Sequence, residues 1–263
     1  MKVGFIGAGN MGSALAKAAS KTNAEIFISD KDEKKRDEVA GELSVLTADN
    51  VRIANECDYI FLAVKPNIIK SVLSEIKDIL KCRPDAVVVS IAAGISIAEI
   101  EAVISDSVQI IRIMPNTPVA VGKGMILWCK NASLTEKNAE AFVSLLSYAG
   151  TLDSIDERLI DAASAVSGCG PAFVYMFIEA LADGGVECGL PRDKAQSYAV
   201  ETLIGAAELL KATGKHPGEL KDAVCSPGGS TISGVHALEE KSFRSATEGA
   251  VVASYKKTLS LSK

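Results

Sequence analysis

The sequence predicts an α/β domain followed by an all-α domain. Short apolar runs alternate with helical segments as far as residue 155, and from Asp156 onward no strand-like pattern remains. The composition agrees, because 48% of the 263 residues are hydrophobic and only 5% are aromatic, which suits small-residue helices packed on a sheet. We therefore predict a domain over residues 1–155 and a helical domain over residues 156–263.

The first predicted strand, Lys2–Ile6, runs directly into a glycine motif. Gly7, Gly9 and Gly12 have the spacing GxGxxG, and a predicted helix follows over Ser13–Ser20. Strand, glycine turn and helix in this order are typical of a dinucleotide-binding loop, with the pyrophosphate at the helix N-terminus. The alternative interpretation is an ordinary glycine-rich turn between a strand and a helix.

The second predicted strand, Glu25–Ser29, ends at Asp30. An acid about twenty residues past the glycines meets the adenosine ribose in this fold, and there Asp30 would favour NAD. Basic residues follow that could meet the 2′-phosphate of NADP, or that simply form the solvated first turn of the next helix. They are Lys31, Lys34, Lys35 and Arg36. The sequence leaves the choice of coenzyme open.

The remaining strands of this half alternate with helices, and three of the strands end in small or turn residues. Carboxyl ends of strands in open α/β sheets are where ligands bind. The predicted strands are Asp58–Val64, Ala86–Ile91, Val108–Met114, Met125–Cys129 and Thr151–Ile155. The predicted helices are Ile68–Leu80, Ile97–Ile104 and Thr135–Tyr148.

Six helices are predicted in the second half, and glycine and proline separate several of them. They are Asp156–Ser164, Ala172–Glu187, Arg192–Thr213, Gly218–Val224, Thr231–Glu240 and Phe243–Leu261. Faces rich in alanine and glycine allow close backbone approach. Packing between subunits and packing within the chain explain such faces equally well.

Charge and cysteine usage exclude several function classes. The net charge is −5, with acids and bases interspersed, so no nucleic-acid partner is expected. Six dispersed cysteines and two histidines offer no usual metal-ligand spacing, so no metal is expected. The N-terminus enters a strand directly, and the uncharged stretch from Ala162 to Ile178 is interpreted as a buried helix start, which predicts a cytoplasmic protein without a membrane span.

A second motif lies near the end of the chain, in Val224–Ile232. Pro227, Gly228 and Gly229 come immediately before a predicted helix, and Ser230 or Thr231 offers a cap and a spare hydroxyl. Free N–H groups at such a helix start would suit a small carboxylate. A plain helix cap after a turn is the alternative interpretation.

Seven segments together resemble pyrroline-5-carboxylate reductase over the whole chain. They are GFIGAGNMG from Gly4, FLAVKP from Phe61, VSIAAG from Val89, RIMPNTP from Arg112, SGCGPAF from Ser167, ALADGGVECGLPR from Ala180 and HPGELKDAVCSPGGSTISG from His216. The resemblance implies a Rossmann-type N-terminal domain and a helical domain that interlocks with a partner. It also implies NADPH- or NADH-dependent reduction of L-1-pyrroline-5-carboxylate to L-proline, by a homodimer or by a decamer of five dimers.

The resemblance also implies site residues. Coenzyme-binding positions are Ile6, Gly7, Ala8, Gly9, Asn10, Met11, Asp30, Asn50, Ala63, Val64, Lys65, Pro66, Ile91, Ala92 and Ala93. Substrate-binding positions are Glu157, Gly228, Gly229, Ser230 and Thr231. Two departures matter: Asp30 stands where family members can carry Ser, which puts an NADPH preference in doubt, and Ala223 stands where some carry Asn.

The expected mechanism depends on positioning. We expect the N–H groups of Gly229, Ser230 and Thr231 to bind the substrate carboxylate, and the Thr231 hydroxyl, as the catalytic group, to bond the ring nitrogen. A related imine or β-hydroxyacid reductase, or a non-catalytic nucleotide-binding protein, is the alternative. The SPGGST segment argues against both alternatives. The related reductases would also need a catalytic lysine in an apolar helix of the second domain, whereas Lys194 and Lys211 are expected to be solvated.

Overall fold

The computed structural model describes residues 1–261, and its contacts divide them into two compact units. The first comprises Met1–Cys169 with the chain from Ser254 onward, and the second comprises Gly170–Ala253. The expected division at 155/156 marks the end of the last strand, but the first unit continues through one more helix, which is bonded to the sheet. Ser262 and Lys263, the last residues of the predicted helical domain, lie outside the described residues.

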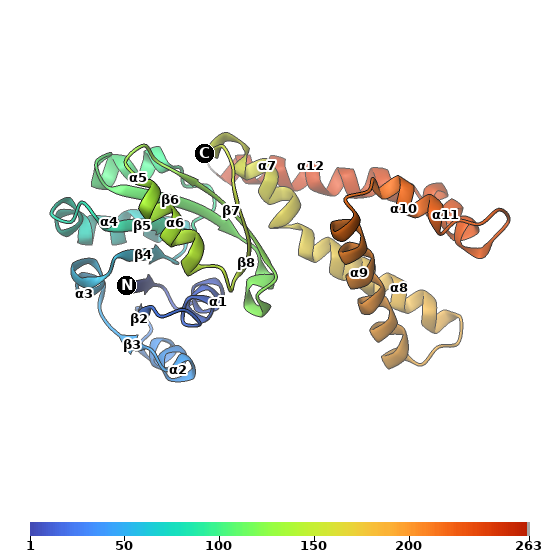
Figure 1. Cartoon of the computed structure of the whole chain (residues 1–263), viewed down its shortest axis with the longest axis horizontal. Helices are drawn as coiled ribbons and strands as arrows, with labels where there is room; N and C mark the ends of the chain where they lie inside the picture. The colour runs from blue at the N-terminus through green and yellow to red at the C-terminus, as the bar shows by residue number, and fades with distance from the viewer. Residues whose placement is uncertain (262–263) are drawn as a thin grey trace. The chain divides into compact units, whose positions relative to one another are not determined.

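The first unit is built on one eight-stranded sheet in the order β3-β2-β1-β4-β5-β6-β7-β8 (Figure 1). All neighbouring pairs are parallel except β6 and β7. β1 lies between β2 and β4, so the strand order reverses there, which is where such sheets bind nucleotides. The strands are β1 (Lys2–Ile6), β2 (Glu25–Ser29), β3 (Leu46–Thr47), β4 (Tyr59–Leu62), β5 (Val87–Ser90), β6 (Gln109–Pro115), β7 (Gly124–Lys130) and β8 (Gly150–Ser154).

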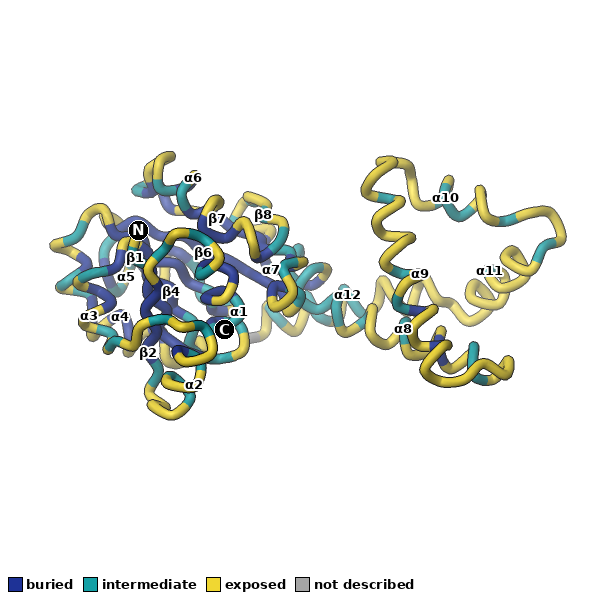
Figure 2. The backbone as a smooth tube through the Cα atoms, turned by 60° about the horizontal axis from the view of Figure 1, so that its bottom comes forward, coloured by how far each residue is buried: buried dark blue, intermediate teal, exposed yellow. Residues whose placement is uncertain are grey.

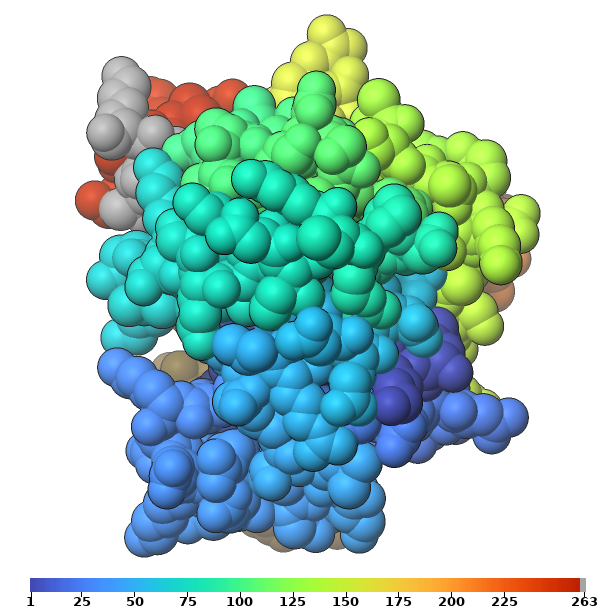
Figure 3. All heavy atoms as spheres, turned by 90° about the vertical axis from the view of Figure 1, so that its left-hand side faces the viewer, coloured from blue at the N-terminus to red at the C-terminus, as the bar shows by residue number. Residues whose placement is uncertain are grey.

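Helices cover both faces of this sheet and make it a three-layer structure. Two apolar clusters define the layers: α1, α2 and α6 pack on one face, and α3, α4, α5 and α7 pack on the other. Figure 3 shows the molecule from the side where α3, α4 and α5 lie. The helices are α1 (Asn10–Ala19), α2 (Glu33–Leu43), α3 (Asn50–Glu56), α4 (Pro66–Lys81), α5 (Ile97–Ile104), α6 (Glu136–Leu145) and α7 (Glu157–Ser167), with a 3₁₀ turn, η1 (Thr117–Val121).

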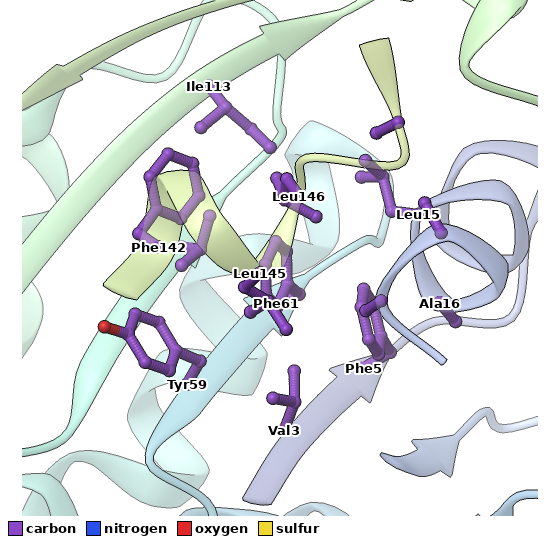
Figure 4. Close-up of a cluster of buried hydrophobic side chains, with 14 of the residues drawn as sticks. Val3, Phe5, Leu15, Ala16, Tyr59, Phe61, Ile113, Phe142, Leu145 and Leu146 are labelled. Atoms are coloured by element: carbon purple, nitrogen blue, oxygen red, sulfur yellow. The ribbon is translucent and has the colours of Figure 1, made fainter. Parts of the chain in front are cut away.

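Strand alternation sends successive side chains into opposite layers. Phe5 of β1 and Phe61 of β4 face the layer of α1 and α6, where their rings stack 4.5 Å apart between centroids (Figure 4). Ile60 and Leu62 face the other layer. These positions are essentially inaccessible to solvent, so both faces of the central strands are buried, as expected for a parallel sheet.

The second unit is helical but has little interior of its own (Figure 2). Its fully buried apolar cluster consists of Ala182, Ala195 and Ala199, which lie where α8 and α9 pack together. The stretch from Ala162 to Ile178, expected to be buried, is instead largely half-buried or exposed. The helices are α8 (Gly170–Glu187), α9 (Arg192–Thr213), α10 (Pro217–Ala223), α11 (Ser230–Glu240) and α12 (Phe243–Leu261), whose last turns belong to the first unit.

Two of the six thiols are predicted to be inert in the folded protein. Burial raises the pKa of Cys57 and of Cys129 from the ordinary 9.0 to about 12, while Cys82 is exposed. Because the thiolate is the reactive form, these two should stay protonated and unlabelled at mildly alkaline pH. Iodoacetamide labelling followed by peptide mass spectrometry should modify Cys82 in the native protein, and Cys57 and Cys129 only after denaturation. Equal labelling of all three in the native state would contradict this assignment.

Candidate coenzyme and substrate sites

The glycine loop lies at the carboxyl end of β1, against the end of β4. Gly7 has φ +113°, which favours glycine, and its N–H donates to the Ser29 carbonyl at 2.7 Å. A Cβ on Gly7 would lie 2.4 Å from the Ala63 carbonyl oxygen, and a Cβ on Gly12 would lie 2.3 Å from the Gly7 carbonyl oxygen. The surrounding protein atoms therefore leave no room for a side chain at either glycine.

Gly9 differs, because a Cβ there would meet no protein atom within 4 Å. It is the N-cap of α1, with ordinary extended backbone, and no side chain caps the helix. The first-turn N–H groups of α1 are thus without a capping side chain, beside an open space that a larger residue would narrow. This cradle fits the pyrophosphate of a dinucleotide.

The other predicted coenzyme residues lie along the same carboxyl edge of the sheet. Asp30 follows β2, and its Oδ2 accepts a hydrogen bond from the Ala8 N–H at 2.7 Å. Asn50 begins α3, and its Oδ1 accepts from the Ser29 hydroxyl at 2.7 Å. Grouped by strand, Ile6, Gly7, Ala8, Gly9, Asn10 and Met11 end or follow β1; Ala63, Val64, Lys65 and Pro66 follow β4; and Ile91, Ala92 and Ala93 follow β5.

Glu157 opens α7 and is bound to two other elements of the first unit. Its Oε1 accepts from the Arg112 Nη1 at 3.0 Å and from the Ile97 N–H at the start of α5 at 2.8 Å. Arg112, on β6, is 4% exposed and also donates to Asp161 Oδ1 at 3.1 Å. This carboxylate therefore holds α7 against the sheet and against the start of α5.

Arg112 and Asn116 make contacts with α7 that the sequence did not predict. Arg112 lies on β6 and Asn116 directly follows it. They bind the two ends of α7, because Arg112 donates to Glu157 and the Asn116 Nδ2 donates to the Ser167 carbonyl at 2.9 Å. The Arg112 Nε is buried without a hydrogen-bond partner among the described residues. The RIMPNTP segment carries both residues, so an arginine within an apolar strand and an asparagine directly after it were the available signal.

The SPGGS turn belongs to the second unit and has the expected form. Gly228 has φ +67°, Gly229 is the N-cap of α11, and no side chain caps that helix. The Gly229 N–H donates to the Ser226 carbonyl at 3.0 Å. This bond occupies one of the three N–H groups expected to bind the substrate carboxylate and leaves those of Ser230 and Thr231. Thr231, in the first turn of α11, is exposed.

Two further side chains take structural roles. The imidazole of His216 accepts from the Gly218 N–H at 3.1 Å and caps α10, and that of His236 lies 3.4 Å from Glu240 on the same helix. Within residues 1–261, no group of three or more His, Cys, Asp or Glu side chains could hold a metal ion.

Family models match both halves of the chain. Residues 2–94 match the model described as "NADP oxidoreductase coenzyme F420-dependent", and residues 157–261 match "Pyrroline-5-carboxylate reductase dimerisation". The second match contains the SPGGS turn and Glu157, and the first contains the glycine loop and Asp30.

Curated relatives and solved structures resemble the chain along its length. Pyrroline-5-carboxylate reductase of Pisum sativum is 39% identical over 99% of this chain and 96% of its own, and that of Escherichia coli is 39% identical over 100% and 98%. The crystal structure of pyrroline carboxylate reductase from Plasmodium falciparum with NADP bound has a TM-score of 0.88 at 34% identity, covering 100% of this chain and 98% of its own. The enzyme from Coxiella burnetii has a TM-score of 0.91 at 30% identity, covering 99% and 98%.

A matched pair of glycine substitutions should separate coenzyme binding from folding. Gly9→Ala should lower the free energy of unfolding by no more than about 1 kcal/mol, since its Cβ enters open space, yet weaken dinucleotide binding by about tenfold or more. Gly12→Ala should destabilise the fold, because its Cβ clashes with the Gly7 carbonyl. Thermal unfolding measures the stability of both variants, and calorimetric titration measures their affinity for the dinucleotide. Unchanged affinity in Gly9→Ala would show that the glycine loop does not bind the coenzyme.

Proposed function

The chain belongs to the pyrroline-5-carboxylate reductase family, and from this premise we propose how its residues reduce L-1-pyrroline-5-carboxylate to L-proline, the last step of proline biosynthesis. The single observation that carries the assignment is the full-length match: both the coenzyme half and the helical half have their counterparts in reductases of one activity. NADH or NADPH is the coenzyme.

The coenzyme is held at the carboxyl edge of β2, β1, β4 and β5. In this proposal the first-turn N–H groups of α1 bind the pyrophosphate, and Asp30 and Asn50 lie toward the adenosine. The segments after β4 and β5 then line the rest of the nucleotide. When bound, the reduced nicotinamide supplies a hydride to the imine carbon.

The substrate is a cyclic imine with a carboxylate, and the start of α11 offers what each group needs. The N–H groups of Ser230 and Thr231 begin a helix that no side chain caps, so an anion there would satisfy them and meet the positive end of the helix dipole. The Thr231 hydroxyl can accept a hydrogen bond from the protonated ring nitrogen. Acceleration in this scheme comes from holding the iminium form in place, since it is the better electrophile.

Glu157 acts in this proposal as a positioning residue more than as a direct ligand. Its Oε1 is already shared between Arg112 and the Ile97 N–H, and Ile97 follows the coenzyme segment Ile91–Ala93 by four positions. The Glu157 side chain is 32% exposed, which leaves it accessible to a substrate as well.

The helical region assembles with another copy of the chain, as the dimerisation model over residues 157–261 supports. We propose a homodimer, with a decamer of five dimers as the larger assembly. An apolar groove of about 600 Å³ lies between α8, α11 and α12 of the second unit, lined by Met176, Phe177, Leu181, Leu238 and Phe243 among others. A second copy covering these side chains would supply the interior that the single chain lacks.

The first helical run of this region is long and apolar. Glu157–Glu187 is, by length and apolar content alone, able to cross a membrane. The same run opens the region that matches the dimerisation model, and we propose that the partner chain covers it in a cytoplasmic enzyme. No nucleic acid or membrane partner is part of this proposal.

The activity is tested by mixing the full chain with L-1-pyrroline-5-carboxylate and each reduced coenzyme in turn. Loss of coenzyme absorbance with stoichiometric formation of proline is the expected result. A β-hydroxyacid or a different cyclic imine reduced faster than pyrroline-5-carboxylate would favour a neighbouring reductase class. Coenzyme binding without turnover of any of these would indicate a non-catalytic nucleotide-binding protein.

Substituting Thr231 should reduce catalysis while leaving the fold intact. Thr231→Ala is expected to lower kcat/KM by about 10²-fold or more, because a transition-state hydrogen bond is lost, and Thr231→Ser should recover most of it. Thr202→Ala on α9 is the matched control, because its exposed hydroxyl bonds the Tyr198 carbonyl of the same helix, at 2.7 Å. Steady-state rates on all three variants decide, and full kcat/KM in Thr231→Ala would refute the role.

A further inference from the structure

A carboxylate is fixed beside the glycine loop, at the end of β2. Asp30 accepts from two backbone groups: the Ala8 N–H at 2.7 Å on Oδ2 and the Asp32 N–H at 3.0 Å on Oδ1. One bond reaches across to the loop after β1, and the other reaches forward to the N-cap of α2. The side chain is therefore held between the two strands where an adenosine ribose lies in this fold.

These two bonds leave acceptor capacity on the carboxylate. A carboxylate has about four lone-pair positions, and backbone N–H groups use two of them in Asp30. Asp30 is only partly buried, so the unused positions are open to a ligand. The two hydroxyls of an unphosphorylated adenosine ribose are donors that match them in number.

The neighbouring cations reduce the negative charge of this segment but do not cancel it. The Arg36 Nε donates to Asp37 Oδ1 at 2.8 Å, and the Lys34 ammonium lies 4.0 Å from Glu38. Asp32 uses its own carboxylate to cap α2. Residues 30–38 carry five carboxylates against four cations, so the segment as a whole is weakly negative.

We propose that Asp30 makes this chain select NADH over NADPH. Resting on the proposed function, this assigns a specificity-determining residue that the family match leaves open. NADPH places a phosphate where Asp30 would accept from the 2′-hydroxyl, which removes a donor and adds like charge beside a fixed carboxylate. The exposed Lys31 and the half-buried Lys35 oppose this selection, and each ammonium lies on a flexible stem.

Direct binding tests the assignment without catalysis. Calorimetric titration of the full chain with NADH and with NADPH should give a dissociation constant for NADPH about tenfold or more above that for NADH. Asp30→Ser should reduce this ratio at least about tenfold, with NADPH binding strengthened and NADH binding weakened. Asp30→Asn keeps an oxygen to accept from the Ala8 N–H while removing the charge, so it should shift the ratio the same way if Asp30→Ser fails to fold.

The matched control is Glu42→Gln, which removes one negative charge from the far end of α2 and should leave the ratio unchanged. Equal affinity for the two coenzymes, or tighter binding of NADPH, in the wild-type protein overturns the proposal. An Asp30 variant whose affinities for NADH and NADPH fall by the same factor also overturns the proposal. Because coenzyme binding is measured without substrate, a protein that prefers NADH yet fails to reduce pyrroline-5-carboxylate would refute the proposed function and leave this inference intact.

Discussion

The close approach of the β1–α1 turn to the end of β4 is the constraint on which the coenzyme half depends. Only a residue without a Cβ fits at Gly7, because the Ala63 carbonyl occupies the position that a Cβ would take. Once Gly7 is there, α1 begins at the carboxyl edge with its first N–H groups without a capping side chain. The same turn brings the Ala8 N–H within hydrogen-bond distance of Asp30. One steric requirement therefore organises both the proposed pyrophosphate-binding loop and the proposed ribose-binding carboxylate.

The helical half depends on a different constraint, because a single chain gives it only a small hydrophobic core. Residues 170–253 bury only three small alanines in their apolar cluster, while Tyr175, Met176 and Leu209 are largely exposed. Burying such side chains is the main favourable term in folding, so this unit requires another surface to cover it. In the proposed site, assembly and substrate binding are then linked, since α11, which begins at the SPGGS turn, has no buried residue of its own.

Periodicity in the sequence predicted the long elements well and the short ones poorly. The helix predicted over Ile68–Leu80 is confirmed as α4, in which Ile69, Val72, Leu73, Ile76 and Leu80 repeat at helical spacing and all are buried. β3 and α3 were missed, since two strand residues and a seven-residue helix are too short to show a period. Helix α1 begins three residues earlier than predicted, at Asn10, because Gly9 itself is the N-cap.

The candidate site was predictable where one motif carries it and not where distant segments meet. The glycine loop and the SPGGS turn are local, and their backbone forms follow from glycine and proline. Arg112 bonds to residues 45 and 49 positions away, so no local pattern indicated its role in holding α7. The bond from the Gly229 N–H to Ser226 depends on the exact turn geometry, which composition does not specify.

The central claim is that the chain transfers a hydride from a reduced nicotinamide to the imine carbon of pyrroline-5-carboxylate. The most direct measurement is a turnover with NADH deuterated at both C4 positions, followed by NMR of the isolated product. The account predicts L-proline with one deuterium, on the ring carbon that was the imine carbon. Deuterium at another carbon, or proline without deuterium, would contradict it.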